Sequence, residues 1–322
     1  MTWAGAWFAL IALSLFMKVP GSFGQATAEF RRTLAVAPAQ PVTLDVEITD
    51  GDLQIIYGRD GQISISATAK SSADTRLDDD FFSKVLTLDQ KENHLIVRHA
   101  PHATYPEAGI TVLYRIDVPY RTEVTSTLNR GKQNITGILG PVKAVTRLGD
   151  ITAAYVSKGL QARADNGNLD IQVIGEHVEA QTGRGNISCS RVAQGVSAET
   201  EDGDITLMLV GPSTATVKKG TGRIDVGGAR GTLVGSTDAG DLHIRAIPHD
   251  DWQLRSASGN VRLDLPRAAK LELDVSTTSG EVQVDREGIA MPNPDPHRFY
   301  QTLNGGGKRI EVRTESGSIV IR

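Results

Sequence analysis

The residues best placed to do chemistry form a column of oxygen-bearing side chains, each of which follows a glycine. The pairs recur mostly every 18 residues, at Gly149-Asp150, Gly167-Asn168, Gly185-Asn186, Gly203-Asp204, Gly240-Asp241 and Gly259-Asn260, with a further glycine at Gly280. Stacked carboxylate and amide oxygens could bind Ca²⁺, as they do in β-roll repeats of nine residues. Here the interval is twice as long and Arg223 interrupts the column. We therefore interpret these residues as a structural turn motif.

The other candidates for catalysis or metal binding do not form a known motif. His94, His99 and His102 are the closest histidines, and no pair among the 7 histidines has the spacing of a zinc protease. The chain has no Gly-x-Ser-x-Gly elbow and no phosphate-binding glycine loop. Cys189, the only cysteine, stands in a column of apolar residues, which indicates a small buried side chain. We expect no enzyme activity, catalytic residue, metal or cofactor.

Two short strands must position each glycine turn, because apolar and polar residues alternate on both sides of it. Two residues after successive glycines stand Ile151, Leu169, Ile187, Ile205, Ile224, Leu242, Val261, Val282 and Ile319. This alternation indicates strands with one buried face, and the repeat indicates stacked coils whose cores are continuous. The sequence predicts an all-β fold: a single-chain β-solenoid (β-helix) of roughly 18-residue, two-strand coils over residues 124–322.

Two segments depart from this repeat. Residues 29–123 are β-rich but less periodic, and we interpret them as an N-terminal β cap, because the open end of a solenoid needs to be covered. Residues 286–308 contain three prolines and a triple glycine, which indicates a loop inserted into the last full coil. Phe299 and Tyr300 lie in this insertion and, as exposed aromatic side chains, are the candidate binding residues.

The N-terminus has the pattern of an export signal. An uncharged, apolar run from Trp3 to Met17 precedes small residues suited to cleavage, so residues 1–26 are predicted to be a signal peptide. An uncleaved anchor, which would be the only expected membrane contact, and a buried helix are the alternatives. We expect an exported protein that is periplasmic, displayed on the cell surface or secreted. The formal net charge of -4 and the lack of a dense basic run argue against nucleic acid as a partner.

The signal-like N-terminus and the repeated Thr-x-x-Gly-Asp-Ile unit, as in Thr200 to Ile205, together resemble a bacterial putative-adhesin family of unknown function with β-strand repeats. The resemblance covers about residues 44–322 and implies an extracytoplasmic location and surface binding. The family has no agreed catalytic residues to carry over.

These observations favour a non-enzymatic, extracytoplasmic, adhesin-like binding or scaffold protein that presents a repetitive solenoid surface. Its expected partner is a cell-envelope protein or glycan. The alternative is a polysaccharide-active β-helix enzyme, which would need clustered carboxylates on adjacent coils and a cleft made by long insertions. Coils of about 18 residues leave little room for such insertions.

Overall fold

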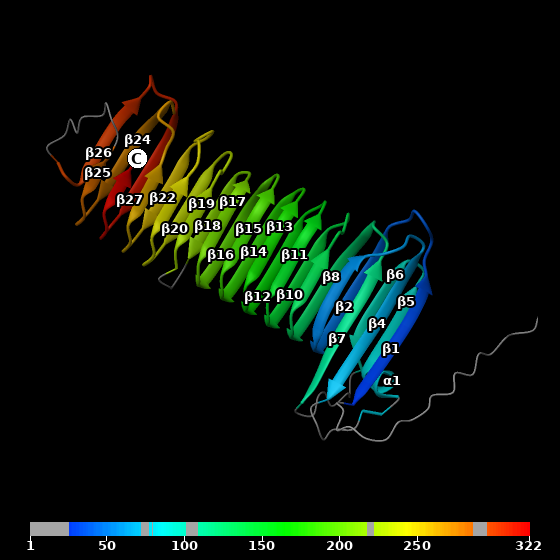
Figure 1. Cartoon of the computed structure of the whole chain (residues 1–322). Helices are drawn as coiled ribbons and strands as arrows, with labels where there is room; N and C mark the ends of the chain where they lie inside the picture. The colour runs from blue at the N-terminus through cyan, green and yellow to red at the C-terminus, as the bar shows by residue number, and fades with distance from the viewer. Residues whose placement is uncertain (1–25, 72–76, 79, 101–108, 218–221, 286–294) are drawn as a thin grey trace, which may run out of the picture.

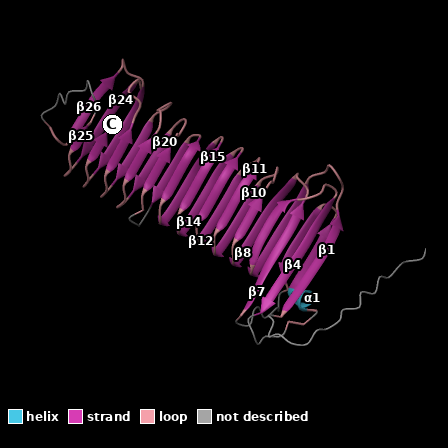
Figure 2. Cartoon of the chain, in the orientation of Figure 1, coloured by secondary structure: helices cyan, strands magenta, loops and turns pink. Residues whose placement is uncertain are grey.

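The computed structural model is an elongated stack of β-strands (Figures 1 and 2). It describes residues 26–71, 77–78, 80–100, 109–217, 222–285 and 295–322. The strands form two sheets that face each other along the rod, and each coil contributes one strand to each sheet. The predicted all-β solenoid is confirmed.

The first sheet, sheet A, contains 14 strands. In spatial order they are β1 (Thr27–Ala35), β4 (Gln62–Ser71), β7 (Ile110–Val118), β3 (Asp52–Tyr57), β9 (Gln133–Thr136), β11 (Ile151–Val156), β13 (Leu169–Ile174), β15 (Ile187–Val192), β17 (Ile205–Val210), β19 (Ile224–Gly227), β21 (Leu242–Arg245), β23 (Val261–Asp264), β28 (Ile319–Ile321) and β25 (Val282–Val284).

The second sheet, sheet B, also contains 14 strands. In spatial order they are β26 (Arg298–Leu303), β24 (Leu271–Thr277), β27 (Lys308–Thr314), β22 (Trp252–Ser256), β20 (Leu233–Thr237), β18 (Ser213–Val217), β16 (Gly195–Asp202), β14 (His177–Arg184), β12 (Leu160–Asn166), β10 (Val142–Leu148), β8 (Thr122–Arg130), β2 (Val42–Asp50), β6 (His94–His99) and β5 (Leu86–Lys91).

The core lies between the sheets, and the repeat columns of the sequence line it. Parallel pairing places Ile151, Leu169, Ile187 and Ile205 directly beside one another, and all four side chains are buried. A further buried column stands at the last residue of β11, β13, β15 and β17, with Val156, Ile174, Val192 and Val210. Since every coil presents the same apolar positions, stacking extends one core along the whole rod.

The coils at the C-terminal end are not stacked in chain order. Strand β27 lies between β22 and β24, and β28 lies between β23 and β25. The coil made of residues 308–321 is therefore intercalated between two coils that precede it in the chain. The sequence pattern predicts a last full coil that is interrupted by an insertion, and the intercalated position of residues 308–321 corrects that prediction.

The expected inserted loop 286–308 is also corrected in part. Residues 286–294 lie outside the described residues, but residues 298–303 form strand β26, which pairs antiparallel with β24 at the end of sheet B. Phe299, expected to be exposed, is fully buried, because alternate residues of this strand face the core. Its neighbour Tyr300 points outward and is 57% exposed.

The N-terminal end combines solenoid coils with antiparallel strands. β2 and β3 form a coil that stacks between the coil of β6 and β7 and the coil of β8 and β9. Beyond them, β4 and β1 extend sheet A and β5 extends sheet B, all by antiparallel pairing. The predicted signal segment falls outside the described residues except for Ala26.

Helix is almost absent from the described part of the chain. Its one helix there, α1 (Phe81–Val85), has five residues and lies at the N-terminal end of the rod, where the Phe82 ring is close to the Phe30 ring of β1. No helix among the described residues is long and apolar enough to cross a membrane.

Candidate binding surface

The predicted turn residues are engaged in bonding one coil to the next. The Oδ1 atom of Asp150 accepts a hydrogen bond from the backbone N–H of Asn168 at 2.9 Å, and the Asn168 Oδ1 accepts one from Asn186 at 2.8 Å. The same contact joins Asn186 to Asp204 and Asp204 to Arg223, both at 2.8 Å. The oxygens thus satisfy backbone donors that would otherwise be left without a partner at the turns.

The ladder also runs through the intercalated coil, because Asp241 accepts from Asn260 and Asn260 accepts from the backbone of Ser318. Among the described residues, no group of three or more His, Cys, Asp or Glu side chains could hold a metal ion. The hydrogen bonds make the turn motif a structural device in which Asp and Asn oxygens accept from backbone N–H groups of the neighbouring coil.

The turn glycines stand where the backbones of neighbouring coils come closest. A Cβ atom at Gly203, Gly259 or Gly280 would collide with the carbonyl oxygen of the glycine in the adjacent coil. Beside this column, a hydroxyl three residues before most of the turn glycines donates to the same kind of carbonyl, as Thr182 does to Gly167 at 2.9 Å and Thr200 does to Gly185 at 3.1 Å. Only glycine, which has no Cβ atom, fits where the backbones of two coils come so close.

A second column, six residues after each turn glycine, has an unusual backbone. Tyr155, Val173, Arg191 and Leu209 all have φ between 54° and 57°, in the left-handed region that disfavours residues with a side chain. Glycine occupies this column at Gly137 and Gly228, with φ of 77° and 70°. The strand pairing skips these positions in every coil without a change of register, so the chain turns a corner of the coil at each of them.

This corner projects large apolar side chains into solvent. Tyr155 is 62% exposed and Leu209 is 59% exposed. Tyr57, at the equivalent position of an earlier coil, is 58% exposed, although it pairs with Val118 as the last residue of β3 and lacks the left-handed backbone. Tyr120 stacks edge-on against Tyr57 with ring centroids 5.5 Å apart, and Met208 is exposed beside Leu209. We call these five residues the corner ridge. From Tyr57 to Leu209 the ridge crosses five coil steps, about 24 Å at the usual strand spacing.

The corner ridge was not predicted from the sequence. A signal for it exists: in coils aligned on the turn glycine, one column holds glycine at Gly137 and Gly228 and large side chains at Tyr155 and Leu209. Because glycine suits the backbone of this column, the turn does not require the bulky side chains that the column carries in other coils.

Four charged residues meet near Tyr300 on sheet B, and we call them the arginine clasp. The Asp274 carboxylate, whose side chain is 7% exposed, lies 2.9 Å from Nη2 of both Arg309 and Arg313 and 3.8 Å from Nη2 of Arg298. Hydrogen bonds from Arg313 lower the pKa of Asp274, against the burial that would raise it. The clasp links β24 to the intercalated β27 and to β26, so its ion pairs hold these three strands together.

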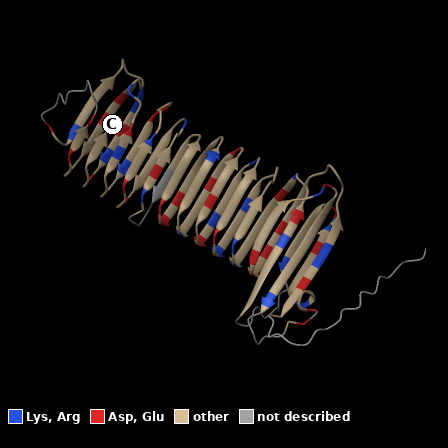
Figure 3. Cartoon of the chain, viewed as in Figure 1, with Lys and Arg blue, Asp and Glu red and all other residues tan. Residues whose placement is uncertain are grey.

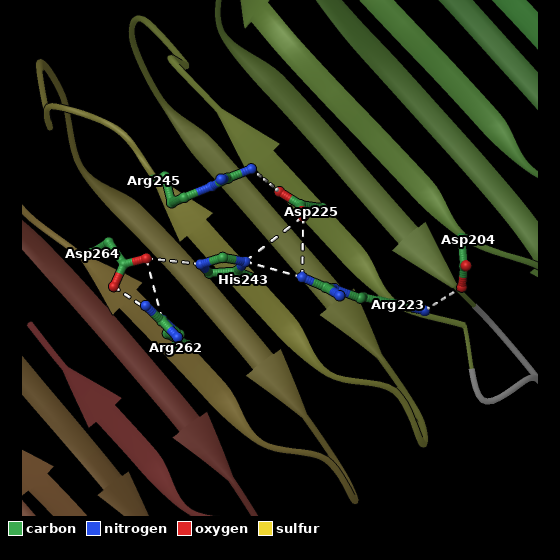
Figure 4. A network of polar contacts seen from close by, with 7 residues as sticks. All are labelled: Asp204, Arg223, Asp225, His243, Arg245, Arg262 and Asp264. Carbon is green, nitrogen blue, oxygen red and sulfur yellow. Dashed lines mark hydrogen bonds and ion pairs between the residues drawn. The ribbon is translucent and has the colours of Figure 1, made fainter.

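A polar network on the outer face of sheet A is similarly closed on itself (Figure 4). His243 accepts a hydrogen bond at Nδ1 from Arg223 (3.0 Å), because a guanidinium can only donate, and its Nε2–H donates to Asp264 (2.8 Å). Burial raises the pKa of Asp264, but the hydrogen bonds from His243 and Arg262 outweigh it and lower the pKa. The network ties β19, β21 and β23 together.

His94 and His99, which were considered for a metal site, have different hydrogen-bond partners. His94 contacts Asp45 at 2.7 Å, whereas His99 accepts from the Thr49 backbone and contacts the Tyr114 hydroxyl at 2.8 Å. Burial lowers the pKa of His99 to about 4, so this imidazole is neutral at physiological pH. His102 lies outside the described residues.

Cys189 is buried in the column with Ile171 and Leu207, as its register predicted. Burial raises the pKa of its thiol to about 12, with a smaller contribution from Asp170. Since the thiolate is the reactive form, we expect native protein at pH 8 to react with a maleimide far more slowly than protein unfolded in urea. Equal labelling rates, measured by intact mass over time, would contradict the packing of this column.

Charged residues of both signs are interspersed along the rod (Figure 3), without an extended field of one sign on the face shown. A depression of about 450 Å³ on sheet B contains Glu123, Glu176 and Glu179. Glu176 binds Lys158 at 2.9 Å and Glu179 accepts from Gln161 at 2.9 Å. These carboxylates are held by neighbouring side chains on the surface of the sheet.

The architecture defines the class: a β-solenoid whose turns, hydroxyls and inner columns serve the stacking of coils and whose corner ridge faces solvent. Residues 116–322 match the model of the family described as Toastrack DUF4097. The chain therefore belongs to the Toastrack DUF4097 family.

Several solved structures are similar over most of the chain. A putative adhesin from Parabacteroides distasonis ATCC 8503 is 10% identical with a TM-score of 0.36, covering 91% of this chain and 96% of that one. A putative adhesin from Bacteroides fragilis NCTC 9343 is 12% identical with a TM-score of 0.33, covering 91% and 97%. A putative cell adhesion protein from Clostridium sporogenes ATCC 15579 is 10% identical with a TM-score of 0.24, covering 91% and 98%. No curated protein matches the chain.

Proposed function

We propose that this protein is a non-enzymatic, extracytoplasmic, adhesin-like binding protein that holds a protein of the cell envelope through its corner ridge. The observation that carries the proposal is the left-handed backbone of Tyr155 and Leu209, whose side chains are exposed and apolar. A residue with a side chain in this conformation costs roughly 1–2 kcal/mol relative to glycine. Residues held in such strained conformations by the surrounding structure are concentrated at functional sites.

The make-up of the ridge favours a protein over a glycan as the partner. Tyrosine, methionine and arginine are enriched at the centres of protein interfaces, and the ridge combines three tyrosines with Met208 and Leu209, while Arg191 stands exposed in the same column. Aliphatic and thioether side chains bury well against another apolar surface but offer a sugar few directed contacts. The extracytoplasmic location rests on the apolar run from Trp3 to Met17.

The test uses Tyr155→Gly. Because glycine suits the left-handed backbone, the variant should keep its free energy of unfolding or gain up to about 1 kcal/mol. Capture of its envelope partner should fall about tenfold or more, as expected for an aromatic hot spot. Urea unfolding and quantitative mass spectrometry of membrane-fraction proteins retained by immobilised chain measure the two effects.

Tyr300→Gly is the control, and it also tests the candidate binding residue that the sequence offers: Tyr300 is comparably exposed but lies on β26, away from the ridge, so the proposal expects no loss of binding. A protein retained by the parent and by this control, and lost with both Tyr155→Gly and Leu209→Gly, is the expected result. Retention unchanged by both ridge variants would refute the ridge as the binding surface. Ridge-dependent binding on a glycan array, without a protein partner, would refute the choice of partner.

A further inference from the structure

Strand β1 ends sheet A with an open side that is long and regular. Within the described residues it pairs only with β4, in an unbroken antiparallel register from Thr27–Lys70 to Ala35–Gln62. The flanking hydrogen bonds, Ser71 N–H to Ala26 and Val36 N–H to Gly61, identify the even-numbered residues as those that bond to β4. In an antiparallel ladder the alternate residues point their backbone groups the other way. Glu29, Arg31 and Thr33 therefore offer N–H and C=O groups on the open side.

The side chains of β1 fit a second copy of the same strand. Only odd-numbered residues can exchange hydrogen bonds across the open side, so a two-fold axis must pass through a residue position. An axis at Phe30 places Glu29 opposite the partner's Arg31 twice and brings the two Phe30 side chains together. An axis at Glu29 or at Arg31 would place two like charges opposite each other, which is unfavourable.

The other strands at the ends of the sheets fit a second copy less well. β26 contains Arg298 but no carboxylate. β25 has three residues, and the Val282 N–H is bonded to the Pro296 carbonyl. β5 carries Asp89 and Lys91 at the same spacing, but an axis at Gln90 lies next to the end of this six-residue strand, so few residues would pair, and the Gln90 side chain crosses to the Ala35 carbonyl at the end of β1. A long open edge strand pairs with other chains unless something prevents it. The charges of β1 favour pairing with a second copy of β1 over pairing with other strands.

We infer that two copies of this protein form a two-fold symmetric dimer by antiparallel pairing of their β1 strands, with the axis at Phe30. The pairing joins sheet A of one copy to sheet A of the other in one continuous sheet. The Glu29–Arg31 contact within each strand, 3.4 Å long and exposed, is replaced by two cross-strand pairs. This contact surface is separate from the corner ridge and does not depend on the proposed function.

Charge reversal tests the inferred register. The complete chain is expressed, the exported product is purified, and sedimentation equilibrium gives its dimer dissociation constant. Glu29→Arg and Arg31→Glu should each raise this constant by about tenfold or more, since two favourable pairs become two like-charge pairs. The double exchange Glu29→Arg with Arg31→Glu should restore it. Arg32→Glu, which makes the same charge change opposite Ala28, should leave it nearly unchanged.

Cross-linking gives a second measurement. With the axis at Phe30, its two copies form a non-hydrogen-bonded pair, whose Cα atoms are about 4.5 Å apart, within disulfide range. Phe30→Cys should give a disulfide-linked dimer on mild oxidation, whereas Arg32→Cys should remain monomeric on a non-reducing gel. A monomeric parent at every concentration, single reversals without effect, or equal cross-linking of both cysteine variants would overturn the dimer.

Discussion

Gly203→Ala should lower the free energy of unfolding by about 3 kcal/mol or more. Two effects add: φ of 148° at Gly203 is almost restricted to glycine, and a Cβ atom there would collide with the carbonyl oxygen of Gly185. The atom that must yield belongs to the backbone of a close-packed coil, so relief requires separating two coils that share hydrogen bonds. Urea unfolding followed by circular dichroism measures the loss.

Gly305→Ala is the control that separates the two effects. Gly305 also has a positive φ, 89°, but a Cβ atom there meets nothing within 4 Å. This variant should lose only the conformational cost, about 1–2 kcal/mol. A loss at Gly203 no greater than the loss at Gly305 would show that the close approach of coils does not require glycine.

Asp274→Asn should lower the free energy of unfolding by about 2 kcal/mol at pH 7. The substitution leaves Arg298, Arg309 and Arg313 gathered around a neutral amide. Removing one partner of a fully buried ion pair costs about 3–5 kcal/mol, and the partial exposure of the three arginines reduces that figure through solvent screening. Asp285→Asn, which removes an exposed pair with Arg322, should change stability by less than about 0.5 kcal/mol.

The pH dependence of the clasp has a definite sign. Because the folded protein lowers the pKa of Asp274, the clasp stabilises the fold at pH values above the unfolded pKa of about 3.9. The stabilisation is lost as the pH falls through the lower, folded-state pKa. The stability difference between parent and Asp274→Asn should therefore persist from pH 7 to about pH 5 and shrink below pH 4. A difference that grows on acidification would contradict the role of the clasp.

The core could be predicted from the sequence because each coil repeats the same apolar positions. Ile151, Leu169 and Ile187 define a column without reference to any distant residue, and the structure buries all three. The same regularity hides the order of the coils. Equivalent coils present nearly identical faces, so the apolar pattern alone fits β27 either outside β24, as chain order would place it, or between β22 and β24, where it lies.

What decides the order lies in contacts between residues far apart in the chain, such as Lys308 with Asp250 and the Arg309 backbone N–H with Asp251, which hold β27 beside β22. Pairs of this kind have no signature in a single sequence, because charged residues also occur on every exposed strand face. The burial of Phe299 was missed for a related reason. A short strand between proline-rich and glycine-rich segments exists only because β24 offers it an edge to pair with.

The intercalated coil has a consequence for resistance to mechanical force. A solenoid stacked in chain order can be peeled from its end, one strand at a time, by tension on its last residue. Here tension at Arg322 reaches β28 and β27 first, and each of these strands is hydrogen-bonded on both sides. Pulling either strand out must break its hydrogen bonds to two neighbouring parallel strands. These bonds share the force and fail together, and are not broken one after another. The outermost coil, formed by β24 and β25, bears no direct load, and the clasp at Asp274 fastens it to the strand under tension.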